Sequence, residues 1–185
     1  MYSYKLIDPS EYYVLHPRPA YLIVSRSSSG RLNVMAASWV SPVSEEPPLI
    51  IVAISRDSLT REYVLETREF TINIVGEEHL NLTYRAGTIS GRSIDKWKML
   101  GLEKEPSKYI DVPGIKGSYG FIECVLNKVV EAGECDLLFC EPKAIHVRED
   151  LYTRYGWDLR KARILMHVRG RVFTVPGRLL FAEKK

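Results

Sequence analysis

Three segments in the first hundred residues gather side chains that could bind a polar ligand. The first, residues 33–39, reads Asn-Val-Met-Ala-Ala-Ser-Trp. Small residues at Ala36, Ala37 and Ser38 would let a flat ligand approach the backbone closely. Backbone N–H groups and the Ser38 hydroxyl could then bond the polar edge of a ring. The alternative is a strand whose small residues merely pack, since ligand pockets are few in any protein.

The second segment, residues 55–60, reads Ser-Arg-Asp-Ser-Leu-Thr and follows an apolar run. Three hydroxyls and the Arg56 guanidinium gather where a helix is expected to begin. A helix N-terminus has free N–H groups and the positive end of the helix dipole, so it favours an anion such as phosphate. The alternative is simple capping by Asp57 or Ser58.

The third segment, residues 85–97, is a loop containing glycine and serine, with Arg92 and Lys96 near its end. Either cation could reach a phosphate, and Trp97 could cover a ring. A solvated basic loop with a core tryptophan is the alternative. The sequence contains no paired-carboxylate, P-loop or GxGxxG pattern, so no competing site is predicted.

Short strands outnumber helices in the expected order of elements. Strands are predicted at 20–25, 31–40, 49–54, 70–75, 119–130, 137–147, 164–168 and 171–175. The run at 49–54 is continuous and apolar, which predicts burial on both faces, whereas 70–75 alternates strictly. Helices are predicted at 59–66, at 77–85 with an end near Gly87, and at 95–100. The prolines in 41–48 predict a loop there, and 103–118 reads as an irregular connection. The pattern favours a mainly β protein, a β-barrel with attached helices.

Composition restricts the class of protein. A chain of 185 residues fits one domain, 1–185, with its own core. The net charge of +3, without a dense basic cluster, argues against nucleic acid as a partner. We find neither a membrane span nor a signal peptide, which predicts a cytoplasmic protein. Three cysteines do not describe a disulfide framework. The absence of glutamine, with only four asparagines, is typical of a thermophile.

Taken together, these segments resemble the flavin reductase-like family, whose fold is the Greek-key-like FMN-binding split barrel. The resemblance runs from about Pro19 to Val147. The matching stretches are, in chain order, Asn33-Val34-Met35-Ala36-Ala37-Ser38-Trp39-Val40-Ser41-Pro42-Val43-Ser44, Pro47-Pro48-Leu49-Ile50, Ser58-Leu59-Thr60, Glu69-Phe70-Thr71-Ile72-Asn73, Ala86-Gly87, and Ser90-Gly91 with Asp95-Lys96.

The resemblance implies an FMN cofactor, a homodimer and a role for most of these side chains. The isoalloxazine and ribityl chain would be lined by Asn33, Met35, Ala36, Ala37, Ser38 and Trp39. The phosphate would be held by Ser55, Arg56, Ser58 and Thr60, with help from Lys96 and Arg92. NADH or NADPH would give hydride to the flavin, which would pass electrons to a second small-molecule acceptor. The cofactor carries such chemistry, so no catalytic residue is nominated.

The chain departs from the family at one point. Where the family often has Gly-Asp-His, this sequence reads Gly133-Glu134-Cys135-Asp136. That histidine can act near the flavin and nicotinamide, so a second hypothesis is an FMN-binding electron carrier without its own NAD(P)H site. A third is a flavin-free binding or structural protein on the same barrel. Cys135 and Cys140 are five residues apart and would point to opposite faces of a strand, so no metal site is predicted.

Overall fold

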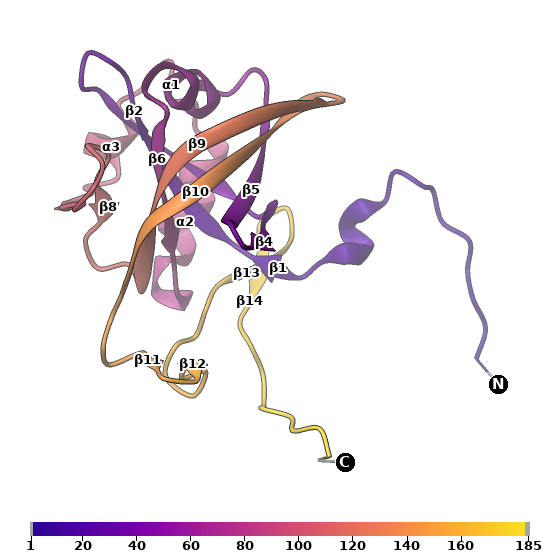
Figure 1. The fold of residues 1–185 in the computed structure, drawn as a ribbon. Helices are drawn as coiled ribbons and strands as arrows, with labels where there is room; N and C mark the ends of the chain where they lie inside the picture. Colours follow the sequence, from indigo (N-terminus) through magenta and orange to yellow (C-terminus); the bar gives the residue numbers. More distant parts are fainter. Residues whose placement is uncertain (1, 184–185) are drawn as a thin grey trace.

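The computed structural model describes residues 2–183 and is built around a seven-stranded antiparallel sheet (Figure 1). Its strands, in spatial order, are β3 (Leu32–Ala37), β2 (Tyr21–Arg26), β6 (Glu69–Ile74), β9 (Gly120–Ala132), β10 (Cys135–Val147), β5 (Pro48–Ser55) and β4 (Val40–Glu45). The helices are α1 (Leu59–Thr67), α2 (Leu80–Thr88) and α3 (Lys96–Met99), with 3₁₀ turns η1 (Tyr12–Leu15) and η2 (Glu77–His79). No helix within the described range is long and apolar enough to cross a membrane.

Three smaller sheets complete the fold. One joins β1 (Arg18–Pro19), β13 (Met166–Arg169) and β14 (Val172–Thr174). The others are two-stranded: β7 (Lys104–Glu105) with β8 (Gly114–Ile115), and β11 (Tyr152–Thr153) with β12 (Gly156–Trp157). Residues 2–11 form an arm that extends away from the rest of the molecule (Figure 1).

The sheet must curl because its two edge strands are consecutive in the sequence. β3 and β4 stand at opposite edges, yet only Ser38 and Trp39 separate them. Three Cα steps span at most about 11 Å, so the edges come close together without forming a ladder. The result is a barrel that is split between β3 and β4. The predicted β-barrel with attached helices is therefore confirmed, although the strand predicted at 31–40 ends at Ala37.

β2 separates two hydrophobic cores because both of its faces are covered. Leu22 and Val24 pack under α2 and α3, while Ile23 points into the barrel, and all three are fully buried. The barrel interior is filled by residues from five strands and α1, namely Ile23, Val52, Ile54, Val64, Phe70, Ile72, Cys124, Leu126, Leu138 and Cys140. Burial of this apolar area is the main stabilising term, and it fixes β2 and β3 against the helices.

The loop predicted at 41–48 is wrong, because most of it forms β4. Proline cannot donate to a ladder, but it is tolerated on an edge strand or beside a bulge. β4 is such an edge, and its pairing with β5 shifts register between Pro42 and Ser44.

Two further expectations need correction. In β5 only Val52 and Ile54 are buried, so this strand is not covered on both faces. The alternating residues, Ile51 and Ala53, point away from the barrel interior, and their side of the strand is only partly covered. The helix predicted to stop near Gly87 continues through it to Thr88. A Cβ at Gly87 would lie 3.2 Å from the Ala36 Cβ, so this glycine serves the close approach of α2 to β3.

The remaining predictions agree with the structure to within a few residues. α1 begins at the Ser58 cap, and α3 begins at the Asp95 cap. β9 and β10 form the long hairpin predicted around Gly133, which is drawn in orange in Figure 1. β6 alternates as expected, but its polar face is also buried. Asn73 there donates to the Leu22 carbonyl and accepts from the Ile115 N–H.

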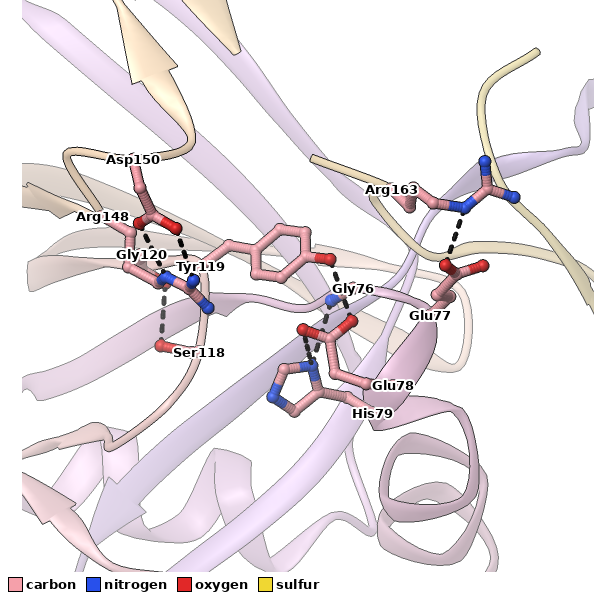
Figure 2. Close-up of polar contacts among 10 residues, drawn as sticks. All are labelled: Gly76, Glu77, Glu78, His79, Ser118, Tyr119, Gly120, Arg148, Asp150 and Arg163. Carbon is pink, nitrogen blue, oxygen red and sulfur yellow. Dashed lines mark hydrogen bonds and ion pairs between the residues drawn. The ribbon is translucent and has the colours of Figure 1, made fainter. Parts of the chain in front are cut away.

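Polar contacts around η2 hold the chain at Arg163, just before β13, against the barrel (Figure 2). Arg163 Nε lies 2.7 Å from Glu77 Oε1, and the Glu77 N–H donates to the Arg163 carbonyl. On the other side, the Tyr119 hydroxyl donates to Glu78 Oε2 at 2.9 Å. Burial and this hydrogen bond raise the pKa of Tyr119 to about 12, so the hydroxyl keeps its proton as donor. The segment thus anchored leads directly into β13 and β14.

Gly76→Ala is expected to destabilise this anchor by about 1–3 kcal/mol, the usual cost of overpacking. A Cβ at Gly76 would sit 2.0 Å from the Tyr119 ring, and the ring itself is buried. The melting temperature of the variant checks the expectation. Gly177→Ala, which meets nothing within 4 Å, serves as the control, and equal melting temperatures for the two variants would contradict the account.

Candidate functional site

A cleft of about 220 Å³ lies where the α1 N-terminus meets β3, the end of α2 and the loop after it. We call it the polar cleft. Seven of the residues singled out from the sequence line it: Asn33, Met35, Ala36, Ser58, Thr60, Arg92 and Lys96. They come from the three separate segments singled out from the sequence, and only the curled sheet brings these segments together.

The floor of the polar cleft is fixed by hydrogen bonds among these same residues. Asn33 Nδ2 donates to Thr60 Oγ1 at 2.8 Å, and both side chains are buried. Ser58 caps α1 by accepting from the Thr60 N–H at 3.2 Å, and its hydroxyl also contacts Met35 Sδ. Gly91 leaves no room for a side chain, because a Cβ there would lie 2.1 Å from Asn33 Oδ1. The hydroxyls and helix N–H groups are therefore held in place at the start of α1.

Lys96 supplies a buried positive charge to the polar cleft. Its side chain is only 4% exposed, and Nζ donates to the Ala86 carbonyl at 2.9 Å. No carboxylate within residues 2–183 forms an ion pair with it. Burial lowers the pKa of Lys96 to about 8, because removal from water penalises the charged form. An anion in the cleft would supply the missing partner.

Arg92 lies at the rim of the cleft and is half exposed. Its Nη1 is 3.0 Å from Glu62 Oε2, and Nη2 donates to the Asp57 carbonyl at 3.2 Å. These contacts hold the loop of residues 90–92 across the start of α1. Arg31 supports the same loop by donating to the Gly91 carbonyl.

A second cleft of about 220 Å³ adjoins the first, and the two share Ala36 and Gly87. We call it the apolar cleft. It is lined by Ala20, Ala36, Ala37, Ser38, Thr83, Tyr84, Gly87, Thr88, His167, Gly170 and Phe173. One wall is β3, an edge strand, so part of its backbone has no partner strand and is free to bond a ligand. Ala37 and Ser38, predicted from the sequence, lie in this cleft.

Of the remaining lining residues of the apolar cleft, Gly87 and Thr88 fall in the segment 85–97 singled out from the sequence, and the others were missed. Thr83, Tyr84, Gly87 and Thr88 lie on one face of α2. Their spacing of three to five residues is the signal that could have found them. His167, Gly170 and Phe173 come from the β13–β14 hairpin. No local signal identifies that hairpin, because its place depends on the anchor around η2.

Three predicted residues lie elsewhere. Arg56 forms ion pairs with Asp136 at 3.3 Å and Glu131 at 3.0 Å, on the side of the β9–β10 hairpin. Ser55 ends β5 and accepts weakly from the Asp57 N–H; neither residue lines the polar or the apolar cleft. Trp39 lies in a third cleft, together with Tyr12 and other residues of η1 and β1.

Cys135 begins β10, opposite Ser55, and lines neither of the two clefts. Burial raises the pKa of its thiol, and the carboxylates of Glu134 and Asp136 raise it further. The group is therefore a thiol, not a thiolate, near neutral pH. Within the described residues no cluster of His, Cys, Asp or Glu side chains has the grouping needed to hold a metal ion.

Comparison with known proteins identifies the family. The model of the flavin reductase like domain matches residues 13–176. An uncharacterised protein of Archaeoglobus fulgidus is 34% identical over 171 residues, which cover 92% of this chain and 93% of the relative. The chain therefore belongs to the family of the flavin reductase like domain, a class of flavin-related redox proteins.

Solved structures agree with this assignment. The flavoredoxin of Desulfovibrio vulgaris (Miyazaki F) superposes with a TM-score of 0.85 at 25% identity, covering 98% of this chain and 97% of that one. An FMN-binding protein from Thermus thermophilus, crystallised with 1-cyclohex-2-enone, gives a TM-score of 0.85 at 25% identity, covering 99% and 100%. The predicted split-barrel fold is thereby confirmed.

Proposed function

We propose that the chain binds FMN in the two adjoining clefts and works as an NAD(P)H-dependent oxidoreductase. The observation that carries the proposal is the change in chemistry along the joined clefts. One end offers hydroxyls, helix N–H groups and Lys96, and the other offers small and aromatic residues beside an edge strand. FMN has the same polarity, with a phosphate at one end and a flat ring at the other. Two similar structures are those of a flavoredoxin and an FMN-binding protein.

In this proposal the chain supplies binding and electrostatics. Ser58, Thr60 and Lys96 hold the phosphate, with Arg92 closing the rim. Ala36, Ala37 and Ser38 form the wall along the ring, and Asn33 and Met35 lie between the two ends. Bound FMN would accept hydride from NADH or NADPH and pass electrons to a second small molecule. The protein positions the reactants and needs no acid–base pair of its own.

The phosphate assignment predicts that Ser58→Ala combined with Thr60→Ala weakens FMN binding at least about tenfold. Hydrogen bonds to a charged group contribute about 1.5–3 kcal/mol each. Ser58→Ala also removes the α1 cap, at a cost of about 1 kcal/mol in stability. Ser58→Asp is the matched variant, because aspartate restores the cap but repels a phosphate. FMN titrations and melting curves of both variants separate binding from folding, and unchanged FMN affinity in both would refute the phosphate assignment.

The absorption spectrum of the purified chain, before and after anaerobic NADH, tests the function itself. Bands of oxidised flavin that bleach with NADH or NADPH support the proposal. Bands that persist with both nucleotides and fall only with dithionite support a second function, that of an electron carrier. Absence of bands after added FMN would overturn both, and would leave a flavin-free binding or structural protein.

The electron carrier is the alternative because of Cys135. The resemblance implies a histidine at this place, and here a neutral thiol occupies it. A neutral thiol at the start of β10, opposite Ser55, offers no charge to a nicotinamide. Cys135→His is the decisive variant if the wild-type chain does not react with NAD(P)H. Bleaching gained by the variant would show that this position controls the donor.

We propose further that residues 1–185 act as one domain and associate as a homodimer. Residues 2–6 of the arm expose Tyr2, Tyr4 and Leu6, each more than nine-tenths accessible to solvent. Apolar side chains exposed in a row are typical of interfaces. Light scattering with size-exclusion chromatography measures the mass of the chain in solution. A monomer at micromolar concentration would contradict the homodimer.

A further inference from the structure

The third cleft, of about 260 Å³, lies beside the apolar cleft and is lined by Tyr12, Leu15, His16, Arg18 and Trp39. We call it the aromatic cleft. Three of its five walls are aromatic or imidazole rings, and Tyr12 packs edge-on to Trp39 with ring centroids 5.3 Å apart. An apolar cavity of about 150 Å³ holds benzene in another protein, so this cleft has room for one substituted aromatic ring.

The single cation of the aromatic cleft lacks an acidic partner. Arg18 is half-buried, and its Nε donates to the Ser38 carbonyl at 3.1 Å. None of the ion pairs formed within residues 2–183 involves Arg18. The Nε bond fixes the guanidinium, and its two terminal nitrogens donate to no acceptor within residues 2–183. A guanidinium held in this way matches the two oxygens of a carboxylate.

A second polar atom in the same wall is also unpaired. His16 Nδ1 donates to the His167 carbonyl at 3.0 Å, which fixes that nitrogen as the protonated one. His16 Nε2 is buried and has no hydrogen-bond partner in the part of the chain that the structure describes. A buried polar atom left alone costs free energy, and such atoms often mark a place that a ligand or water completes.

The aromatic cleft is connected to the proposed flavin site through the link between β3 and β4. Ser38 lines the apolar cleft and accepts from Arg18, whereas the next residue, Trp39, lines the aromatic cleft. His167, which also lines the apolar cleft, holds His16. The two clefts have no lining residue in common, but these contacts join a wall of one to a wall of the other at two places.

We infer that the aromatic cleft binds a planar aromatic carboxylate, with the ring packed against the exposed Trp39 indole and the carboxylate on Arg18. The Trp39 ring supplies flat apolar surface, and the half-buried guanidinium without an ion-pair partner favours an anion, so a neutral aromatic compound or a small aliphatic anion satisfies only one of the two. The binding itself does not depend on FMN. If FMN occupies the apolar cleft as proposed above, the aromatic carboxylate is the second small molecule that receives the electrons. That role rests on the proposed function.

Benzoate is the probe, and the full chain is titrated with it in the presence and absence of FMN. Calorimetry measures the dissociation constant, and quenching of Trp39 emission reports the location, with Trp39→Phe as the spectral reference. Saturable binding of benzoate is expected in both forms. Benzyl alcohol lacks the carboxylate and acetate lacks the aromatic ring. Both are therefore expected to bind at least about tenfold more weakly than benzoate.

Arg18→Met is expected to weaken benzoate binding at least about tenfold and to leave benzyl alcohol unchanged. Arg154→Met, an exposed arginine at the β11–β12 turn, is the matched control and should not alter either. Arg18 also contacts the Ser38 carbonyl, so Trp39→Ala is a second variant in case Arg18→Met does not fold. Trp39→Ala removes the exposed indole ring that lines the cleft, so it should weaken benzoate binding as well.

The inference is overturned if benzoate fails to bind the folded chain, or if it binds Arg18→Met and Trp39→Ala as tightly as the wild type. Closure of the cleft by a second copy of the chain would appear as no benzoate binding, with Trp39 emission that changes on dilution, and would also overturn it. FMN titration is a separate measurement. Benzoate binding without FMN binding would refute only the proposed function. FMN binding without benzoate binding would refute only this inference.

Discussion

Lys96→Met is expected to lower the affinity of the chain for FMN by about 10- to 100-fold. A hydrogen bond from a charged group contributes about 1.5–3 kcal/mol, and each 1.4 kcal/mol is a factor of ten. Methionine keeps much of the apolar stem, so the packing under α2 changes little. Among the described residues, the ammonium has only the Ala86 carbonyl as a hydrogen-bond partner, which is unusual for a buried charge. An FMN titration of the two proteins gives the ratio directly.

The pH dependence of FMN binding distinguishes a direct charge from a packing effect. Burial lowers the pKa of free Lys96 to about 8, and a bound phosphate would raise it again. The complex therefore holds a proton that the free protein loses as the pH rises above about 8, so affinity falls above that pH. Lys96→Met should lack this fall.

Lys98→Met is the control, because Lys98 lies on the same short helix and is exposed. It should bind FMN with the affinity and pH profile of the wild type. If Lys96→Met and Lys98→Met behave alike, Lys96 does not contact the phosphate.

Glu123→Leu is expected to destabilise the chain by about 3–5 kcal/mol, the cost of breaking a buried charged network. For a domain of this length that corresponds to a fall of roughly 6–20 °C in melting temperature. The Glu123 carboxylate is fully buried and accepts from the Lys108 and Tyr109 N–H groups, each at 2.7 Å. His146 Nε2 lies 2.6 Å from the same carboxylate. Removal of the oxygens leaves two backbone donors and one ring nitrogen without this partner.

Acid titration of Glu123→Gln separates the charge from the shape of the side chain. Burial alone would raise the pKa of Glu123, but its three hydrogen bonds outweigh burial and leave the pKa below the usual 4.5. Stability from this group is therefore fully present above about pH 4.5 and is lost as the pH falls through the lower folded value. Glu123→Gln should lack that component. Glu149→Leu, at an exposed position, controls for the loss of one carboxylate, and it should melt close to the wild type.

The sequence predicts the strands and the start of α1 well because their signals are local. Ser58 caps α1, and the small residues at 36–38 lie in the clefts, as their types suggest. Gly87 shows where local signals fail. A glycine near the end of a helical pattern predicts the helix C-terminus, but α2 continues through Gly87 to Thr88. The function of Gly87 here is contact with Ala36 on another strand, and no local pattern reveals such a contact.

The polar and apolar clefts also depend on contacts between distant residues. Arg56 is next to the polar cleft in sequence, yet the carboxylate of Asp136 on a distant strand directs it away. β4 forms despite Pro42, because an edge strand needs only one set of ladder bonds. The β13–β14 hairpin reaches the apolar cleft only through the Glu77–Arg163 anchor. Each of these outcomes is decided by a partner more than 70 residues away or by a place in the sheet.

The link of two residues between β3 and β4 also limits how far the barrel can open. Trp39 is bonded through its carbonyl to the Ala53 N–H at 3.0 Å, so one end of the link is tied to β5. At this end the two edges cannot separate by more than three Cα steps, about 11 Å, whatever ligand is present. Next to the link, adjustment to ligands of different size therefore has to come from the other walls, α2 and the β13–β14 hairpin, which lie outside the seven-stranded sheet.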